Sequence, residues 1–302
     1  MGTNFKVDII SKGQSDICDK LKVLAQDTEA ELKSGNVEKI LLDECEEIMI
    51  ASDGAFDVRI GELINLWDIN GPNEGWTPPS EEEIGNALKS ASDVATGTQS
   101  DAYDFGAVGK GLYLDRAADV LKQNKAGSGV ISAGGSILVY GRKADGSDWN
   151  VAIVDPFVGL NGNSGAAGNA GSGEGAYAGS GSSTYGKIRI THTDKQDTTY
   201  ISTSGSYERY KEYNGMRYHH ILDPRTGYPS DSGLVSVTII SHDSGFITDA
   251  LSTAVFVLGE EEGVKLCEKY DVSAILIRND GSEVTAGDLK KDGDTWTYKP
   301  LQ

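Results

Sequence analysis

The sequence predicts an α+β fold in which mixed, mainly antiparallel sheets carry packed helices. Segments of helical period and segments of strand-like alternation occur in separate runs, rather than alternating one by one. Consecutive strands without intervening helices argue against a doubly wound, Rossmann-type sheet. The chain has 302 residues, 38% of them hydrophobic. That is enough to bury a substantial core, either in one large domain or in two intimate lobes.

The elements follow in order along the chain. We expect a strand at 4–11, helices at 14–34, 37–52, 81–90 and 107–124, strands at 129–133, 136–141, 149–154, 187–192, 199–203 and 234–241, helices at 246–258 and 260–269, and strands at 273–278 and 295–299. The start at Ser80 is well marked, because Ser80 precedes three glutamates and a Ser-x-x-Glu pattern caps a helix N-terminus.

Residues 159–186 interrupt this pattern. The stretch holds ten glycines and has no apolar period, which is typical of a flexible linker or loop. It lies between two strand-like segments, so we interpret it as an insertion within a single domain spanning 1–302. A neutral surface loop and a mobile lid over a site both fit this composition.

Charge and cysteine content exclude several classes of protein. The formal net charge is −19 with no concentrated basic patch, which argues against binding to nucleic acid or to an anionic membrane. An anionic ligand would need local compensation, for which a bound cation is the simplest source. Cys18, Cys45 and Cys267 have neither metal-binding nor redox spacing, so buried thiols are expected.

The segment H-H-I-L-D-P-R-T-G-Y-P (219–229) is a stiff turn, because each of its two prolines fixes its own φ and restricts the preceding residue. Such a loop can hold His220 and Asp223 in fixed positions. The alternative is a purely structural turn with a solvated histidine pair. Zinc is a poor fit, since adjacent histidines diverge and no second pair of ligands has the required spacing.

A helix is predicted to begin near Ser244 or Thr248 and to end at Gly259. Asp249 and Thr253 are four residues apart and share one face of it. A carboxylate and a hydroxyl in that arrangement can bind one hard cation, Mg²⁺ or Ca²⁺. The alternative is an acidic residue that complements the helix dipole beside a packed threonine.

Six motifs in the same order resemble the ApbE family of FAD:protein FMN transferases. They are G-A-F-D-V-R-I-G-E-L-I-N-L-W (54–67), D-F-G-A-V-G-K-G-L-Y-L-D (104–115), A-G-G-S-I (133–137), T-S-G-S-Y-E-R-Y (203–210), H-H-I-L-D-P-R-T-G-Y-P (219–229) and D-A-L-S-T (249–253). The resemblance runs from Met1 to about Gly259. It implies an ApbE-like fold and a Mg²⁺-dependent enzyme. Such an enzyme transfers FMN from FAD to a Thr or Ser hydroxyl of an acceptor protein and releases AMP.

The resemblance also assigns site residues. Positions implied to contact the flavin nucleotide are Met1, Ala55, Phe56, Asp57, Asp104, Lys110, Gly134, Gly135, Thr203, Ser204, Gly205 and Ile221. Positions implied to ligate the metal are Ala107 (through its carbonyl), Asp249, Ser252 and Thr253. His220 is the candidate base for the acceptor hydroxyl, because imidazole titrates near neutral pH. Asp223 is a candidate to orient it. Trp67 is expected to be a core aromatic.

One family segment is missing. The stretch E-A-E-L-K-S-G-N-V-E-K-I (29–40) leads straight into the next helix, where the family usually has a segment with a tyrosine over the flavin ring. Tyr177 or Tyr185 is a candidate substitute for that ring.

Partners and location follow from the resemblance alone. It implies an acceptor with a D-x-x-[S/T]-G-A-[S/T]-like motif in a membrane electron-transfer system. It also implies an extracytoplasmic location, with the signal or lipid anchor of the lipoprotein absent from this sequence. Two alternatives stay open: a Mg²⁺-dependent FAD pyrophosphatase and a non-catalytic FAD-binding protein.

Overall fold

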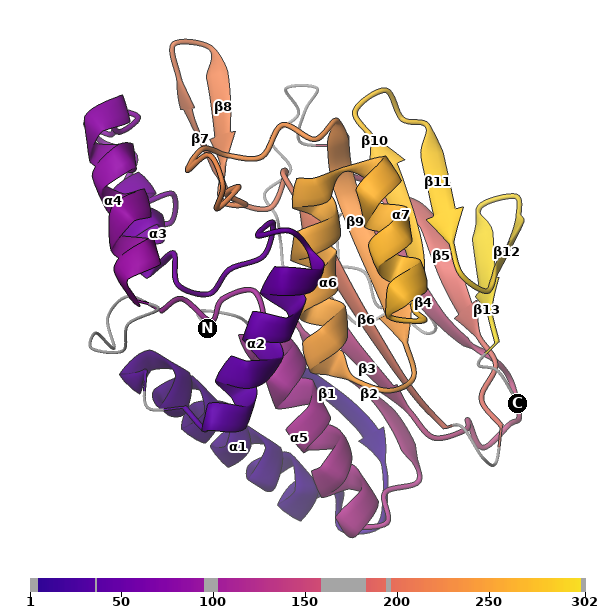
Figure 1. The fold of residues 1–302 in the computed structure, drawn as a ribbon. Helices are drawn as coiled ribbons and strands as arrows, with labels where there is room; N and C mark the ends of the chain where they lie inside the picture. The colour runs from indigo at the N-terminus through magenta and orange to yellow at the C-terminus, as the bar shows by residue number, and fades with distance from the viewer. Residues whose placement is uncertain (1–4, 36, 95–102, 159–182, 194–196, 300–302) are drawn as a thin grey trace.

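The computed structural model describes residues 5–35, 37–94, 103–158, 183–193 and 197–299 (Figure 1). In this part of the chain there are seven helices and thirteen strands. The helices are α1 (Gln14–Ser34), α2 (Lys39–Ala51), α3 (Gly61–Trp67), α4 (Glu81–Val94), α5 (Gly109–Gln123), α6 (Gly245–Leu258) and α7 (Glu260–Lys269). The strands are β1 (Phe5–Ile10), β2 (Ser128–Ala133), β3 (Ser136–Tyr140), β4 (Trp149–Val154), β5 (Thr184–Ile190), β6 (Thr198–Gly205), β7 (Tyr210–Tyr213), β8 (Met216–His219), β9 (Leu234–Ser241), β10 (Ser273–Arg278), β11 (Glu283–Ala286), β12 (Leu289–Asp292) and β13 (Thr295–Tyr298).

The strands form two large sheets and one hairpin. The larger sheet has seven strands in the order β1-β2-β3-β6-β9-β10-β11, and every neighbouring pair in it is antiparallel. The second sheet has the order β12-β13-β5-β4, in which β13 and β5 pair in parallel. β7 and β8 form a separate antiparallel hairpin. The expectation of mixed, mainly antiparallel sheets is confirmed.

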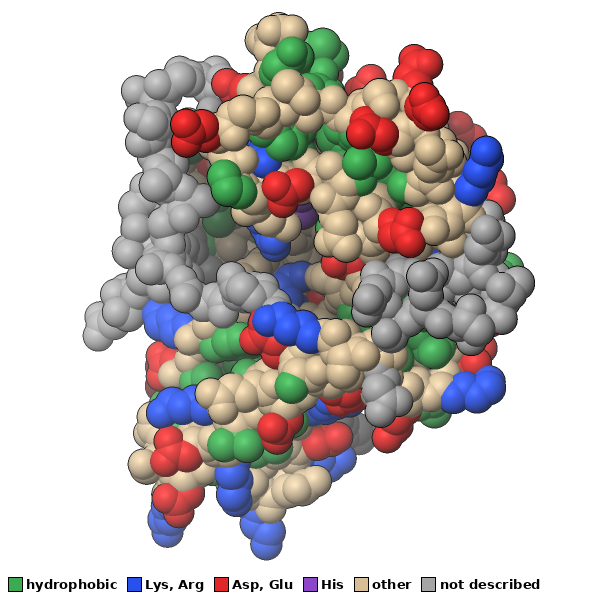
Figure 2. Space-filling view, turned by 90° about the vertical axis from the view of Figure 1, so that its left-hand side faces the viewer, with side chains coloured by type: hydrophobic (Ala, Val, Ile, Leu, Met, Phe, Trp, Pro, Cys, Tyr) green, Lys and Arg blue, Asp and Glu red, His purple; other side chains and the backbone are tan. Residues whose placement is uncertain are grey.

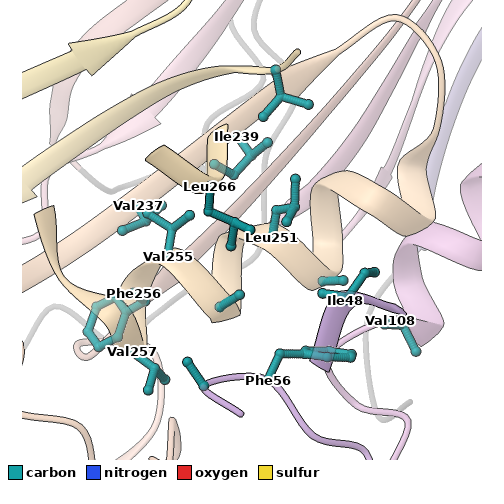
Figure 3. Close-up of a cluster of buried hydrophobic side chains, with 14 of the residues drawn as sticks. Ile48, Phe56, Val108, Val237, Ile239, Leu251, Val255, Phe256, Val257 and Leu266 are labelled. Atoms are coloured by element: carbon teal, nitrogen blue, oxygen red, sulfur yellow. The ribbon is translucent and has the colours of Figure 1, made fainter. Parts of the chain in front are cut away.

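Helices cover one face of the large sheet and the small sheet covers the other. One apolar cluster joins α2, α6 and α7 to β9 and β10, and another joins α1 and α5 to β1, β2 and β3. A third fills the space between the two sheets and includes Trp149, Ile188 and Trp296. Figure 3 shows α6 at the centre of the first cluster, with Leu251, Val255 and Phe256 facing apolar side chains of the sheet and of neighbouring segments. The large sheet is therefore buried on both faces.

A smaller cluster stands beside the main body. It contains Trp67 of α3, Ile84 and Ala87 of α4, and Leu222 near the β7–β8 hairpin. Trp67 is 1% exposed, as expected of a core aromatic. Its ring lies 5.7 Å from that of Tyr218, and its Nε1–H donates to the carbonyl of Gly227. Figure 1 shows α3, α4 and the hairpin together at one end of the molecule.

Every element expected from the sequence is present within a few residues of its predicted bounds. Five elements were not predicted: α3, β7, β8, β11 and β12. Four of them are strands of four residues each, and α3 has seven residues. Segments this short show few periods, so their pattern is weak, and of the four-residue strands only β13 was predicted among the described residues. Most of the predicted insertion, residues 159–182, lies outside the described residues, and its last three residues belong to β5.

Candidate active site

Two helices meet at a pair of glycines, and their contact positions the site. A Cβ atom on Gly111 of α5 would lie 2.1 Å from the carbonyl oxygen of Gly245 on α6. A Cβ atom on Gly245 would lie 2.7 Å from the Gly111 oxygen. Only glycine permits backbones to approach so closely. The contact brings the first turn of α5 within reach of Asp249, which follows Gly245 by one turn of α6.

Asp249 is a buried carboxylate that accepts two hydrogen bonds and forms one ion pair. Asp249 as a whole is 3% exposed. Oδ1 accepts from the hydroxyl of Ser136 at 3.0 Å and pairs with Nζ of Lys110 at 3.1 Å. Oδ2 accepts from the backbone N–H of Gly111 at 3.0 Å. Asp249 therefore satisfies one of the free N–H groups in the first turn of α5, where a negative charge is also favoured by the helix dipole.

Hydroxyl groups line the same face of α6. Ser252 Oγ donates to the Asp249 carbonyl at 2.8 Å. Ser204 Oγ on β6 lies 2.8 Å from Ser252 Oγ and 3.3 Å from Thr253 Oγ1. The face of α6 that Asp249 and Thr253 share, as expected from their spacing, thus carries a partly buried cluster of hydroxyl groups.

The turn before α5 contributes the carbonyl oxygen of Gly106 to the site. Asp104 does not cap the helix, which begins at Gly109. Instead, its Oδ1 accepts a hydrogen bond from the N–H of Gly106 at 2.8 Å, which forms an Asx turn. The Nζ of Lys110 lies 3.2 Å from the carbonyl oxygen of Gly106. The ammonium group therefore bridges the turn that contains Ala107 and the carboxylate of Asp249.

The donor set fits a hard cation. Asp249, Thr253, Ser252 and the backbone of Ala107 offer only oxygen atoms, which Mg²⁺ prefers. Among the described residues, no three His, Cys, Asp or Glu side chains group together in a way that would hold a metal ion. A single carboxylate binds Mg²⁺ weakly by itself, because such sites usually rely on substrate phosphates for their remaining ligands. The protein side of the site therefore suits an ion that arrives with an anionic substrate.

His220 lies directly after β8, and the carbonyl of Arg209 fixes its ring. Nδ1 is 3.2 Å from that oxygen, and the backbone N–H of His220 donates to the same atom at 3.1 Å. A carbonyl can only accept, so the neutral ring carries its proton on Nδ1 and leaves Nε2 as an acceptor. Burial, together with the positive charge of Arg209, lowers the pKa of His220 to about 3. The imidazole is neutral at pH 7 and can accept a proton.

Asp223 is placed differently from the prediction. Its carboxylate forms a two-point contact with Arg225, with both N–O distances at 2.8 Å, and it also accepts from the Arg225 backbone N–H. Within the described residues, Nδ1 of His220 contacts the Arg209 carbonyl, not Asp223. The reason is the turn itself: the side chain of Asp223 is held by the residues that follow it, through the short-range bonding typical of Asp before Pro-x-x-Gly.

Glu208 and Arg209 belong to the site although sequence reasoning gave them no role. Partial burial raises the pKa of the Glu208 carboxyl group, while the charges of Lys110 and Arg209 oppose that rise. Arg209 Nη1 donates to Oδ1 of Asn70 at 3.2 Å. The motif T-S-G-S-Y-E-R-Y contains both residues, so the signal was present, but their neighbours come from α5 and from the loop after α3. Ser136 escaped notice for the same reason.

Several residues predicted to contact the nucleotide instead pack against other residues of this chain. The hydroxyl of Thr203 lies 2.9 Å from that of Thr238, because alternate residues of a strand point to opposite faces and Ser204, like Ser202, faces α6. A Cβ atom on Gly135 would lie 2.7 Å from the Thr203 carbonyl, and one on Gly205 would lie 2.3 Å from the ring of Tyr207. These two glycines are needed to pack neighbouring protein atoms. Gly134 has φ +61°, a turn conformation that favours glycine.

The side chains of the other residues implied to contact the flavin are buried or paired within this chain, where the structure describes them. Ala55, Phe56 and Ile221 are at most 5% exposed and belong to the cluster around α6. Asp57 is paired with Arg59 at 2.7 Å. Met1 lies outside the described residues, and so does Tyr177. Tyr185 stacks on Trp296 and donates to the Gly281 carbonyl, so its ring is used in packing at the second sheet.

A hollow opens on the face shown in Figure 2, where Lys or Arg side chains and a His side chain are visible at its floor. A separate cavity of about 250 Å³ lies between the loop after α3 and β7, lined by Asn73, Trp76, Tyr210, Lys211 and Glu212. Arg209 adjoins this cavity, since it directly precedes Tyr210 and is bonded to the loop through Asn70.

Comparison with known proteins agrees with this geometry. The sequence profile described as the ApbE family matches residues 1–276. The chain belongs to the ApbE family. A relative from Klebsiella pneumoniae named FAD:protein FMN transferase is 32% identical over 74% of this chain and 64% of its own length. One of the same name from Haemophilus influenzae is 27% identical over 78% of this chain and 64% of its own length. The matched region thus spans slightly under two thirds of these two relatives.

Solved structures in the ApbE family share the fold. The ApbE protein of Thermotoga maritima superposes with a TM-score of 0.73 at 26% identity, covering 94% of both chains. The flavinyl transferase ApbE of Pseudomonas stutzeri gives a TM-score of 0.66 at 25% identity, covering 95% of this chain and 91% of the other. The ApbE-like fold expected from the six motifs is confirmed. No helix of the described residues combines the length and apolar character needed to cross a bilayer.

Proposed function

We propose that this ApbE-family chain is an FAD:protein FMN transferase, acting with Mg²⁺ on a Thr or Ser hydroxyl of an acceptor protein. The observation that carries the proposal is the buried carboxylate of Asp249 beside the N-terminus of α5, together with the partly buried hydroxyl cluster of Ser252, Thr253 and Ser204. Together with Lys110, these groups suit a pyrophosphate and its counterion. The names of the relatives from Klebsiella and Haemophilus support the same activity.

The chemistry is a phosphoryl transfer. The acceptor hydroxyl oxygen bonds to the phosphorus of the FMN half of FAD, the bond from that phosphorus to the bridging oxygen breaks, and AMP leaves with that oxygen. Nε2 of His220 takes the hydroxyl proton. The low pKa of His220 in the ligand-free protein is compatible with this role, because a neighbouring pyrophosphate would raise the proton affinity of the imidazole.

Positioning and charge stabilisation account for most catalysis in such reactions. Ser136 and the Gly111 N–H hold Asp249 in place, and Lys110 supplies a cation near the phosphates. Bound Mg²⁺, held by Asp249, Thr253, Ser252 and the Ala107 carbonyl, would neutralise pyrophosphate charge. An excess of negative charge in the whole chain makes this local compensation necessary.

We also propose that the acceptor carries a D-x-x-[S/T]-G-A-[S/T]-like motif in a membrane electron-transfer system, and that the protein works outside the cytoplasm. Resemblance to the family supports both points. Fractionation of cells that express the full-length protein tests the location.

The activity is tested by incubating the protein with FAD, Mg²⁺ and a carrier protein bearing the acceptor motif, followed by intact mass measurement and nucleotide analysis. The expected result is a gain of one FMN on the carrier with one AMP released, lost in EDTA. A carrier with the target Thr replaced by Ala is the control. FMN and AMP released without carrier modification would instead show an FAD pyrophosphatase. Intact FAD retained by the protein would show a flavin-binding protein.

A further inference from the structure

Lys110 occupies the space where a cation is expected. Its Nζ lies 3.1 Å from Asp249 Oδ1 and 3.2 Å from the carbonyl oxygen of Gly106. A carboxylate oxygen and a carbonyl oxygen on either side of one positive charge are the environment that a hard cation also selects. The side chain of Lys110 is 18% exposed and that of Asp249 only 4%. The ammonium group therefore neutralises a carboxylate that has little access to water.

The three partners of Asp249 differ in how far they can move away. The Gly111 N–H is part of the backbone of α5, so it cannot move without the helix. The Ser136 hydroxyl is on a short side chain of β3 and can only turn about its Cα–Cβ bond. Lys110 is attached through a flexible four-carbon stem and keeps partial contact with solvent. When a second cation approaches Asp249, Lys110 is the donor that can give way.

We propose that Lys110 holds the metal position in the metal-free protein, gives it up when a divalent cation binds, and then contacts FAD. The ammonium group leaves Oδ1 of Asp249 as the divalent cation approaches, and Lys110 can then pair with the pyrophosphate of FAD. At the Asp249 carboxylate, the single positive charge of Lys110 is replaced by the two charges of the metal ion. The ammonium group of Lys110 then pairs with the pyrophosphate of the substrate. Asp249 thus stays paired at every stage. This inference rests on the proposed function, since that function supplies the metal and the pyrophosphate.

The exchange makes two opposite predictions for one variant. Lys110→Gln removes the competing cation, so metal without FAD binds more tightly. The same variant lacks the group that would contact the pyrophosphate, so FAD binds more weakly. A purely structural role of Lys110 would weaken both interactions. Loss of a neighbouring cation alters the proton affinity of a carboxylate by about 10- to 1000-fold, which sets the scale of the expected gain in metal affinity.

The test uses Mn²⁺ as the probe, measured by the electron paramagnetic resonance of the free ion, with no turnover required. Lys110→Gln is expected to bind Mn²⁺ at least about tenfold more tightly than the wild type without FAD. Flavin fluorescence in the presence of Mn²⁺ is expected to show weaker FAD binding. The matched control is Arg209→Gln, which also removes a positive charge facing the site, but one that is bonded to Asn70 instead of Asp249. It is expected to change Mn²⁺ affinity much less.

A second measurement on the wild type protects the test against misfolding of the variant. Acetylation of Lys110 by an amine-reactive ester, followed by mass spectrometry, is expected to increase when Mn²⁺ is added and to decrease when FAD is then added. Unchanged or weaker Mn²⁺ binding by Lys110→Gln, or an equal gain in Arg209→Gln, would overturn the exchange. Absence of Mn²⁺ binding to the wild type, with and without FAD, would overturn both the exchange and the metal dependence of the proposed function. Normal metal-dependent transfer with no exchange signature would overturn the exchange alone.

Discussion

Asp115 and Asp249 make an instructive comparison, because each carboxylate binds the N-terminus of the other's helix. Asp115 on α5 accepts from the N–H groups of Gly245 at 2.6 Å and Phe246 at 2.9 Å, and from the hydroxyl of Ser244 at 3.0 Å. Asp249 on α6 accepts from the N–H of Gly111 at 3.0 Å. The two helices are thus capped reciprocally across the glycine contact.

The two carboxylates differ in what else surrounds them. All the partners of Asp115 are fixed parts of the fold, and they include the Tyr200 hydroxyl. Burial raises the pKa of Asp115 nonetheless. Asp249 has one movable partner, Lys110, and lies beside the hydroxyl cluster and near Glu208. The capping interaction of Asp115 therefore stabilises the fold alone, whereas that of Asp249 is combined with one partner that can be exchanged.

The largest effect is expected from Asp249→Ala. Loss of the only carboxylate among the proposed metal ligands should reduce FMN transfer by about 1000-fold or more, comparable to removing a principal group that stabilises charge in the transition state. The free energy of unfolding should fall by only about 1 kcal/mol, the usual cost of a lost helix cap. Transfer rates and urea unfolding check these values. Asp243→Ala, which replaces an exposed carboxylate just before α6, is the control, and substantial transfer by Asp249→Ala would refute the assignment.

Asp115→Ala is expected to reverse that pattern. It leaves two N–H groups and a hydroxyl at the start of α6 without their acceptor, at a cost of about 3 kcal/mol in the free energy of unfolding. The folded fraction should keep most of its transfer activity. Urea unfolding and single-turnover kinetics measure the two quantities. Asp119→Ala, at an exposed site one turn further along α5, should change stability by less than about 0.5 kcal/mol. A loss of activity without a loss of stability would remove the distinction between the two carboxylates.

Gly111→Ala should weaken both capping interactions, that of Asp115 and that of Asp249. The added methyl group would meet the Gly245 carbonyl and the Asp249 Cβ, so the helices must separate. Overpacking of this kind costs about 1–3 kcal/mol, and the altered position of Asp249 should also slow transfer. Gly85→Ala is the matched control, because a Cβ there meets nothing within 4 Å and α4 should gain about 0.5–1 kcal/mol. Thermal unfolding and transfer rates would show whether the two capping interactions are coupled.

The last prediction concerns a pH dependence of stability due to His220. Its pKa is about 3 in the folded protein against 6.5 as the ordinary value. Between these values the unfolded chain binds the proton and the folded protein does not, so wild-type stability should rise with pH from about 3 to about 6.5. His220→Gln should lack this contribution. The difference in unfolding free energy between the two proteins, measured across that range, checks the sign. A constant difference would show that His220 titrates normally.

The sequence by itself determined the α+β class, the order and bounds of the longer helices and strands, and the end of α6 at Gly259. Periodicity and capping are local, so they are visible in a single sequence. The pattern Ser80-x-x-Glu83 forms the expected capping box, and Ser244 rather than Thr248 caps α6. The shared face of Asp249 and Thr253 also followed from spacing alone. Among the described residues, local pattern missed α3 and four of the five strands that have only four residues.

Only the tertiary structure decided which groups surround those residues. The partners of Asp249 lie 113 positions away at Ser136 and 138 positions away at Gly111. The contact between Arg209 and Asn70 spans 139 positions. Sheet pairing and helix crossing create these contacts, and no local propensity encodes them. The prediction that Asp223 orients His220 relied on nearness in sequence, whereas the structure gives that place to the carbonyl of Arg209, brought there by the β7–β8 hairpin.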